Sequence, residues 1–122
     1  MKVYKCKSCL SVAVELVEGK EACEKNYQEM KANTVDASGE KHLPVAEQKE
    51  NKIKVMVGSI EHPMLEEHHI MWIYLETTKG GMIRKLNPGE KPEAEFLLSE
   101  GEKPIAVYEY CNLHGLWKQE MK

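Results

Sequence analysis

The sequence predicts a small all-β protein, and three observations support that prediction. Apolar and polar residues alternate in several short segments, turns rich in Gly and Pro separate these segments, and no stretch carries a convincing amphipathic helical period. Strands at this spacing are typical of a small antiparallel sandwich or barrel. The length of 122 residues allows one ordinary domain, or one domain with a small appendage.

The beginning of the chain, residues 1–36, is predicted to form a separate small unit. Residues 3–5 are expected to be a short strand, and the alternation over residues 12–16 predicts a second strand. Between them lies Cys6-Lys7-Ser8-Cys9, a pair of cysteines at the spacing of a metal-binding knuckle. The following small and polar stretch, residues 34–39, is expected to be a linker.

The rest of the chain, residues 37–122, is predicted to be one β domain. Its segments are rich in Val, Ile, Tyr and Trp, and each is too short for a long helix. The turns between them contain Gly or Pro, which ends a strand locally. The expected strands are residues 43–45, 53–57, 69–77, 82–86, 94–98 and 105–110, with turns at residues 79–81, 87–89 and 99–104.

Composition and charge argue against several functional classes. The longest apolar run, residues 70–75, is far shorter than the roughly 20 residues that a membrane helix needs. A net charge of −3 argues against general nucleic-acid binding. The N-terminal residues have no apolar segment typical of a secretory signal, and the four cysteines do not resemble a disulfide framework. We therefore expect a cytoplasmic protein with metal-bound or free thiols.

The five histidines and the late cysteine all fall at strand ends or in loops of the β domain, where a rigid sheet can present side chains to one point. Taken alone, each of these residues is at least as well explained as an ordinary surface His or buried Cys as it is as a metal ligand. Only their joint occurrence favours a metal site. Two residues separate the late Cys from the last His, and one tight loop can bring both to one metal. His69 is expected to lie on the opposite strand face from His68 and is treated as an ordinary strand residue. The candidate ligands are His42, His62, His68, Cys111 and His114.

This set of ligands indicates which metal it suits. Five protein ligands are too many for a structural zinc ion, which is normally four-coordinate. Four imidazoles and one thiolate suit a mid-row transition metal, and iron is the natural candidate. A six-coordinate ion would keep one position for a small ligand.

The motifs around these residues resemble the desulfoferrodoxin and neelaredoxin family, the superoxide reductases. The resemblance covers residues 40–118 and implies a seven-stranded immunoglobulin-like domain. The matching motifs are Glu-Lys-His-Leu-Pro-Val at residues 40–45, Val-Gly-Ser-Ile-Glu-His-Pro-Met at residues 57–64, His68 with Ile70, Trp72 and Ile73, and Tyr-Cys-Asn-Leu-His-Gly-Leu-Trp-Lys at residues 110–118.

The resemblance also implies an activity and a site. The activity is one-electron reduction of superoxide to hydrogen peroxide at one mononuclear non-haem ferrous iron per chain. Lys41 is implied to attract superoxide and to help deliver protons through water. Glu40 is implied to bind the oxidised iron at its sixth position and to help displace peroxide. The implied iron ligands are His42, His62, His68 and His114 in the equatorial positions and Cys111 in the axial position.

The N-terminal unit departs from the family pattern. Two-iron members of the family have a desulforedoxin-like domain in which four cysteines surround a second iron. Here Cys6 and Cys9 match the first pair, but Cys23 stands alone where the family has two adjacent cysteines. Three sulfurs cannot complete a tetrahedral iron–thiolate site without another ligand, such as Glu24 or water. We expect a degenerate desulforedoxin-like domain without the second metal. Zinc or iron on a substituted ligand set, or a disulfide from Cys23, remains the alternative.

The resemblance implies partners as well. The electron donor would be rubredoxin or a similar small redox protein, and the protein would form a homodimer. Two other functions stay open from the residues alone. One is a non-catalytic module that binds iron for electron transfer without an open coordination position, and the other is a structural zinc protein.

Overall fold

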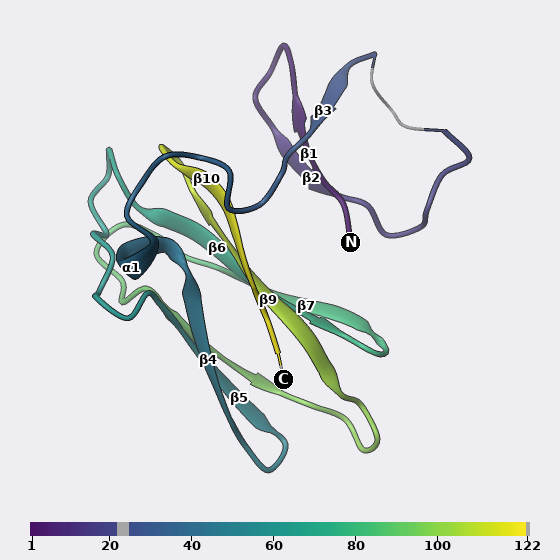
Figure 1. Ribbon diagram of the computed structural model, residues 1–122, viewed down its shortest axis with the longest axis vertical. Coiled ribbons are helices and arrows are strands. Elements are labelled where there is room, and N and C mark those ends of the chain that lie inside the picture. Colours follow the sequence, from purple (N-terminus) through teal and green to yellow (C-terminus); the bar gives the residue numbers. More distant parts are fainter. Residues whose placement is uncertain (22–24, 122) are drawn as a thin grey trace. The chain divides into compact units, whose positions relative to one another are not determined.

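The computed structural model describes residues 1–21 and 25–121. The chain divides into two compact units, Met1–Lys31 and Ala32–Lys122, and each is described by itself (Figure 1). Within the described residues, no helix is long and apolar enough to cross a membrane.

The first unit is a small antiparallel sheet. Strand β1 (Val3–Cys6) lies in the middle, between β2 (Val12–Val14) and β3 (Tyr27–Glu29). Its side chains form most of the buried surface, since Val3, Tyr4 and Cys6 are all buried. The second predicted strand ends earlier than expected, because Leu16 beyond it is exposed.

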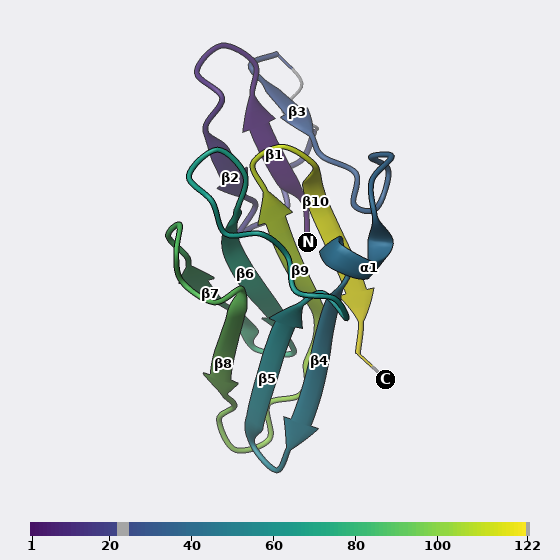
Figure 2. The ribbon, with the colours of Figure 1, turned by 90° about the vertical axis from the view of Figure 1, so that its left-hand side faces the viewer.

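The second unit is a sandwich of two antiparallel sheets, as the all-β prediction expected. One sheet has the order β10-β9-β6-β7 and the other the order β4-β5-β8. Figure 2 shows β8, β5 and β4 side by side as one layer. The seven strands are β4 (Pro44–Lys49), β5 (Lys52–Val57), β6 (Ile70–Thr77), β7 (Gly80–Lys85), β8 (Glu93–Leu97), β9 (Pro104–Cys111) and β10 (Gly115–Glu120).

The core lies between the two sheets. In β5 the predicted alternation is confirmed, with Ile53, Val55 and Val57 buried and Lys54 and Met56 between them exposed. Phe96 of β8 and Leu75 of β6 are fully buried in the same core. Burying each such side chain stabilises the fold by about 1.5–3 kcal/mol. This packing gives the loops at the ends of the strands a rigid support.

Two elements of the second unit were not predicted. Helix α1 (Gly39–His42) is a single turn, closed by a hydrogen bond from the Leu43 N–H to the Gly39 carbonyl at 2.9 Å. A turn this short has no apolar period to detect. Strand β10 lacks the alternation of a typical strand, because two adjacent residues, Leu116 and Trp117, are its buried ones.

The boundary between the two units falls before residue 32, whereas the sequence predicted it between Asp36 and Ala37. Asn33 explains the difference, because it binds strand β10 through three hydrogen bonds. Its backbone N–H donates to the Leu116 carbonyl at 3.0 Å, its side-chain amide donates to the Lys118 carbonyl at 3.0 Å, and its Oδ1 accepts from the Lys118 N–H at 2.8 Å. These bonds attach the expected linker to the β domain.

Candidate metal centre

The five candidate ligands come from four places at one end of the β-sandwich. His42 ends helix α1, His62 and His68 lie in the connection between β5 and β6, Cys111 ends β9, and His114 lies in the turn to β10. The ligand atoms of His42, His62, His68 and Cys111 all lie within 4.8 Å of one another. The structure therefore brings together residues that are up to about 70 positions apart in the chain, through packing of the two sheets.

Backbone carbonyls fix the orientation of two of the imidazoles. The Nδ1 atom of His42 lies 2.7 Å from the Ser38 carbonyl oxygen, and Nδ1 of His62 lies 2.7 Å from the Pro63 carbonyl oxygen. Because a carbonyl oxygen only accepts, each Nδ1 carries the hydrogen and donates it. In the neutral rings, each Nε2 therefore presents a lone pair, which is the arrangement of a metal-ligating histidine.

These lone pairs converge without a hydrogen between them. Nε2 of His42 lies 3.0 Å from Nε2 of His62, although neither nitrogen has a proton to donate in the neutral form. Nε2 of His68 is buried and has no hydrogen-bond partner among the described residues. Facing lone pairs and an orphaned buried nitrogen are unfavourable unless a cation lies between them. The donor set thus fits a metal ion.

Burial keeps these imidazoles neutral. Desolvation is the main cause that lowers the pKa of His42 and of His68, and it lowers the pKa of His62 to about 4. Mutual repulsion between the charged forms of the histidines lowers these pKa values further. At neutral pH the rings therefore present lone pairs, as metal binding requires.

The four imidazoles occupy the corners of a quadrilateral. Adjacent ring centroids are 4.6 Å apart for His42 and His62, 4.7 Å for His62 and His68, 5.1 Å for His68 and His114, and 4.8 Å for His114 and His42. The diagonal pair His42 and His68 is 6.4 Å apart. Adjacent rings are steeply inclined, at 74° to 88°, so their edges rather than their faces meet. Such an arrangement can direct four nitrogens to one ion.

Cys111 and His114 complete the cluster. Nδ1 of His114 lies 3.1 Å from Nε2 of His42 and 3.9 Å from the Cys111 sulfur. His114 therefore faces the centre with Nδ1, whereas His42 and His62 face it with Nε2. Burial raises the pKa of the Cys111 thiol, while backbone N–H groups of His114 and Leu113 lower it by hydrogen bonding to the sulfur. A bound cation would favour the thiolate over the thiol.

Trp117 supports two of the ligands from beneath. Its ring stacks on His42 with a centroid separation of 5.0 Å and an angle of 23°. Its Nε1–H donates to the His114 carbonyl at 3.1 Å. The turn between the strands also needs Gly115, whose φ of 75° is a conformation that favours glycine.

Asn112 is a residue that the sequence reasoning missed. Its Oδ1 accepts from the His69 N–H at 2.9 Å, its Nδ2 donates to the Glu67 carbonyl at 3.0 Å, and its own N–H donates to the His69 carbonyl at 3.2 Å. These bonds hold the residues on either side of His68. Its position between two ligands in the sequence is the signal that could have identified it.

Glu109 is a second residue near the cluster that the sequence reasoning missed. Its side chain is fully buried, and its carboxyl oxygens have no hydrogen-bond partner in the part of the chain that the structure describes. Desolvation raises its pKa well above the ordinary value, which favours the uncharged form of the carboxyl. A Glu within the apolar strand β9 was the available signal.

His69 does not belong to the group of residues, His42, His62, His68 and Cys111, whose ligand atoms lie within 4.8 Å of one another. Its backbone pairs with Asn112, and its Nδ1 is buried without a hydrogen-bond partner among the described residues. The structure thus places His69 beside the cluster rather than in that group.

Glu40 and Lys41 both lie on helix α1 and are exposed. The positive charge of Lys41 contributes to lowering the pKa of His42 and of His68, which places its ammonium within electrostatic reach of the cluster. The Glu40 backbone is held in place, because its carbonyl accepts from the Ser59 hydroxyl at 3.2 Å and from the Ile60 N–H at 3.0 Å.

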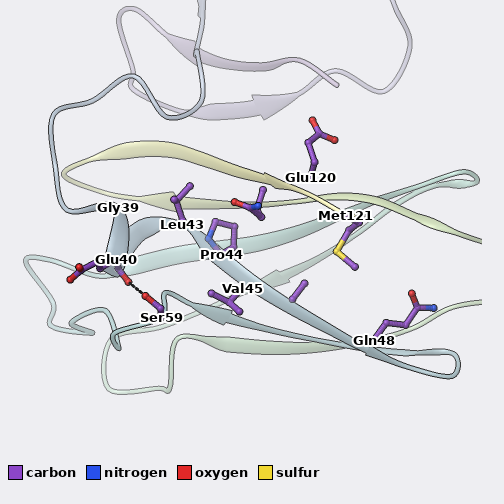
Figure 3. A pocket seen from close by; sticks show the side chains of 11 residues that line it. Gly39, Glu40, Leu43, Pro44, Val45, Gln48, Ser59, Glu120 and Met121 are labelled. Carbon is purple, nitrogen blue, oxygen red and sulfur yellow. Dashed lines mark hydrogen bonds between the residues drawn. The ribbon is translucent and has the colours of Figure 1, made fainter.

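A cavity of about 670 Å³ lies beside α1, between the edge strands β4 and β10 (Figure 3). Its lining is mostly apolar and includes Leu43, Pro44 and Met121 but none of the five candidate ligands. Figure 3 shows the Glu40 carboxylate directed away from these side chains. The cavity is therefore separate from the histidine cluster.

In the first unit, Cys6 is the last residue of β1 and Cys9 lies in the turn that follows it. Cys6 is buried and Cys9 is exposed. Hydrogen bonds from the Cys9 thiol, the Ser8 hydroxyl and backbone N–H groups lower the pKa of Cys6 to about 6. Cys23, the third cysteine of the predicted vestigial site, lies outside the described residues.

Comparison with protein families matches residues 34–120 to desulfoferrodoxin. The desulfoferrodoxin of Syntrophotalea carbinolica is 46% identical over 98% of this chain and 96% of the relative. The superoxide reductase of Pyrococcus horikoshii is 36% identical over 71% of this chain and 90% of the relative.

Solved structures give the same relationship. The superoxide reductase from Treponema pallidum superposes with a TM-score of 0.79 at 34% identity and covers 98% of this chain and 100% of its own. The superoxide reductase from Giardia intestinalis superposes with a TM-score of 0.58 at 32% identity and covers 68% of this chain and 98% of its own. The first likeness therefore spans both units of the chain, and the second about two thirds of it.

Proposed function

The chain belongs to the desulfoferrodoxin family, and from this premise we propose that it is a superoxide reductase. It reduces superoxide by one electron to hydrogen peroxide at a mononuclear non-haem iron. The observation that carries the proposal is the quadrilateral of imidazoles with the buried Cys111 beside it. This donor set suits iron and exceeds what a structural zinc ion takes.

The iron would be held by side chains that the structure already brings together, and when bound it supplies the electron and an open position for a small anion. The neutral imidazoles add no charge, so the Cys111 thiolate is the one anionic ligand of the set. Carbonyl bonds to His42 and His62 fix both rings before the metal binds. The proposed ligands are His42, His62, His68, His114 and Cys111.

Lys41 is proposed to attract the substrate. Superoxide is an anion and the whole chain has a net charge of −3, so the attraction must be local. The exposed ammonium of Lys41, next to His42 in the chain, supplies that local charge. Forming peroxide from superoxide also consumes two protons, and Lys41 is placed to pass them on through water.

Glu40 is proposed to act after the reduction. Its carboxylate is exposed and would compete with peroxide for the open ligand position of the oxidised iron, which would help to displace the product. The Glu40 carbonyl is bound by Ser59 and Ile60, so we expect the side chain, rather than the helix, to move.

Stopped-flow or pulse-radiolysis measurement of the reduced, iron-loaded protein with superoxide tests the activity. We expect rapid oxidation of the iron and one peroxide per superoxide, without dioxygen release. Zinc-loaded protein is the matched control and should not react. An iron protein that exchanges electrons with a carrier but leaves superoxide unchanged would instead support the non-catalytic electron-transfer module.

The first unit is proposed to be a degenerate desulforedoxin-like domain, covering residues 1–36 with the linker and lacking a second metal. The support is the cysteine count, since three sulfurs are one short of a tetrahedral thiolate site. Metal analysis decides this, because one iron per chain is expected and two metals per chain would contradict it.

The partners and location follow from family membership and composition. We propose that rubredoxin or a similar small redox protein donates electrons, that the protein is a homodimer, and that it works in the cytoplasm. Reduction of the ferric protein by rubredoxin and sedimentation analysis test the first two points. A monomer at all concentrations would contradict the proposed dimer.

A further inference from the structure

The turn that follows β1 holds two cysteines at close range. The Leu10 N–H donates to the Cys6 carbonyl at 3.2 Å, which closes residues 6–10 into one turn. Residues three apart in a turn have Cα atoms within about 7 Å, which is close to the span of about 4.4–6.8 Å that a disulfide accepts. Cys6 and Cys9 can therefore join without unfolding the unit.

The surroundings of the two sulfurs differ in a way that suits a redox pair. The Cys6 sulfur accepts from the Cys9 backbone N–H at 3.3 Å and lies 3.4 Å from the Ser8 hydroxyl, so its anionic form is stabilised. Cys9 is exposed, and its sulfur lies 3.2 Å from the Ser11 hydroxyl. The accessible sulfur can meet an oxidant, while the buried one is set up as a nucleophile.

Within residues 1–21 and 25–121, the structure groups the two sulfurs with no further metal ligand. Neither sulfur belongs to a group of three or more His, Cys, Asp or Glu ligand atoms in that part of the chain. Apart from each other, the two sulfurs have hydroxyl and backbone groups as partners, which stabilise thiolates but are poor ligands for zinc or iron.

We propose that Cys6 and Cys9 form a reversible dithiol–disulfide pair that hydrogen peroxide oxidises. The Cys9 thiol takes one oxygen from peroxide, giving a sulfenic acid and one water. The Cys6 sulfur then attacks the Cys9 sulfur, the S–O bond breaks, and the hydroxyl leaves as a second water with the Cys6 proton. Overall, two thiols lose two hydrogens, and one peroxide becomes two waters.

The inference rests on the proposed function for the origin of the oxidant, since peroxide is the product of the iron centre. It gives the first unit a role that needs no second metal. The pair would respond to the peroxide that the same chain generates, and a cellular dithiol would restore it by thiol–disulfide exchange.

The test adds hydrogen peroxide directly to the full-length, iron-loaded protein, so its outcome does not depend on superoxide reduction. Free thiols are alkylated after the reaction, and peptide mass spectrometry locates the disulfide. The Cys23→Ser variant removes the third cysteine of the first unit. We expect a Cys6–Cys9 disulfide in this variant and in the unaltered protein, formed in proportion to peroxide and reversed by dithiothreitol.

The Cys9→Ser variant is the matched control, because Cys9 is exposed and the change spares the core. In that variant we expect no intramolecular disulfide with Cys6 and loss of the reversible step. Three results would overturn the proposal: both thiols still alkylated after peroxide, a disulfide that always includes Cys23, or a metal that copurifies with Cys6 and Cys9. The visible spectrum of the iron shows independently whether the second unit is intact.

Discussion

At the scale of single residues, the centre depends on side chains whose charge and protonation are set by their neighbours. His42 and His62 are fixed as lone-pair donors by backbone carbonyls, while Lys41 adds the positive charge that the overall acidic chain lacks. Substitutions that keep the shape but change one such property therefore separate binding of the metal from reaction with the substrate.

Lys41→Ala should slow the reaction with superoxide while iron stays bound. Loss of a local positive charge lowers the association rate of an anion, by about tenfold or more at low salt. Stopped-flow rates as a function of ionic strength measure the effect, and Lys41→Arg should retain most of the rate. An unchanged second-order rate at low salt would exclude electrostatic attraction by Lys41.

Cys111→Ser should remove the visible absorption that arises from charge transfer between the thiolate and ferric iron. A serine oxygen keeps the size of the side chain but lacks the sulfur orbitals and the acidity of the thiol. The oxidised spectrum and the iron content are compared with those of the unaltered protein. If the band persisted with iron bound, Cys111 would not be the sulfur ligand.

At the scale of elements, strands β5, β6 and β9 support the site, and its proposed ligands lie in helix α1, at the end of β9 and in the loops between strands. The strands were predictable because their buried residues alternate or run continuously, as Ile53, Val55 and Val57 show. Helix α1 and strand β10 were not, because a four-residue turn has no period and β10 buries adjacent residues. These two elements matter most here, since α1 carries His42 and β10 carries Trp117.

Asn112→Ala should loosen the metal centre. The substitution removes both side-chain hydrogen bonds that join the β9–β10 turn to the segment around His68. Changes in such outer contacts typically cost about 10–100-fold in metal affinity. The rate of iron release to a chelator measures this, independently of any reaction with superoxide.

Asn112→Asp is the matched control for that change. It keeps the oxygen that accepts from the His69 N–H but loses the donor to the Glu67 carbonyl, so an intermediate release rate is expected. Iron release as slow as in the unaltered protein for both variants would show that Asn112 does not position His68.

Glu102 should make the β8–β9 connection sensitive to pH. The Thr77 hydroxyl and the Ser99 N–H donate to its carboxylate, and they lower its pKa below the ordinary value. A lowered pKa means that the contribution to stability is present above the unfolded pKa and is lost as pH falls through the folded value. Glu102→Gln should therefore be less stable than the unaltered protein at neutral pH.

The difference in stability between the two proteins should shrink in acid, because protonation removes the charge in the unaltered chain as well. Urea unfolding of both proteins at neutral pH and at about pH 2–3 measures it, since the loss takes place below the ordinary carboxyl pKa of about 4.3. A difference that stayed constant across this range would mean that the carboxylate charge is not what stabilises the connection.

At the scale of the whole molecule, the structure brings together His42, His62, His68 and Cys111, four of the residues that the sequence predicts as ligands. This cluster was predictable because motifs with Cys and His at defined spacings carry the information, whereas Asn112 and Glu109 act only through contacts that folding creates. The structure divides the chain after Lys31, whereas the predicted boundary follows Asp36. Residues 34–39 are small and polar like a linker, but the bonds that Asn33 makes to β10 have no signature in one sequence.

Two truncated chains test where the second unit begins. A chain of residues 32–122 keeps Asn33 and its three hydrogen bonds to β10, so it should fold and bind iron. A chain of residues 37–122 lacks all three and should be less stable by roughly 1.5–4.5 kcal/mol, at about 0.5–1.5 kcal/mol per hydrogen bond. Asn33→Ala in the full-length protein removes only the two side-chain bonds, so the stability that it loses should be smaller than the loss in the shorter chain.

Because β10 carries Trp117, which stacks on His42, the shorter chain should also release iron faster. Equal unfolding free energies for the two truncated chains would show that residues 32–36 are a linker after all.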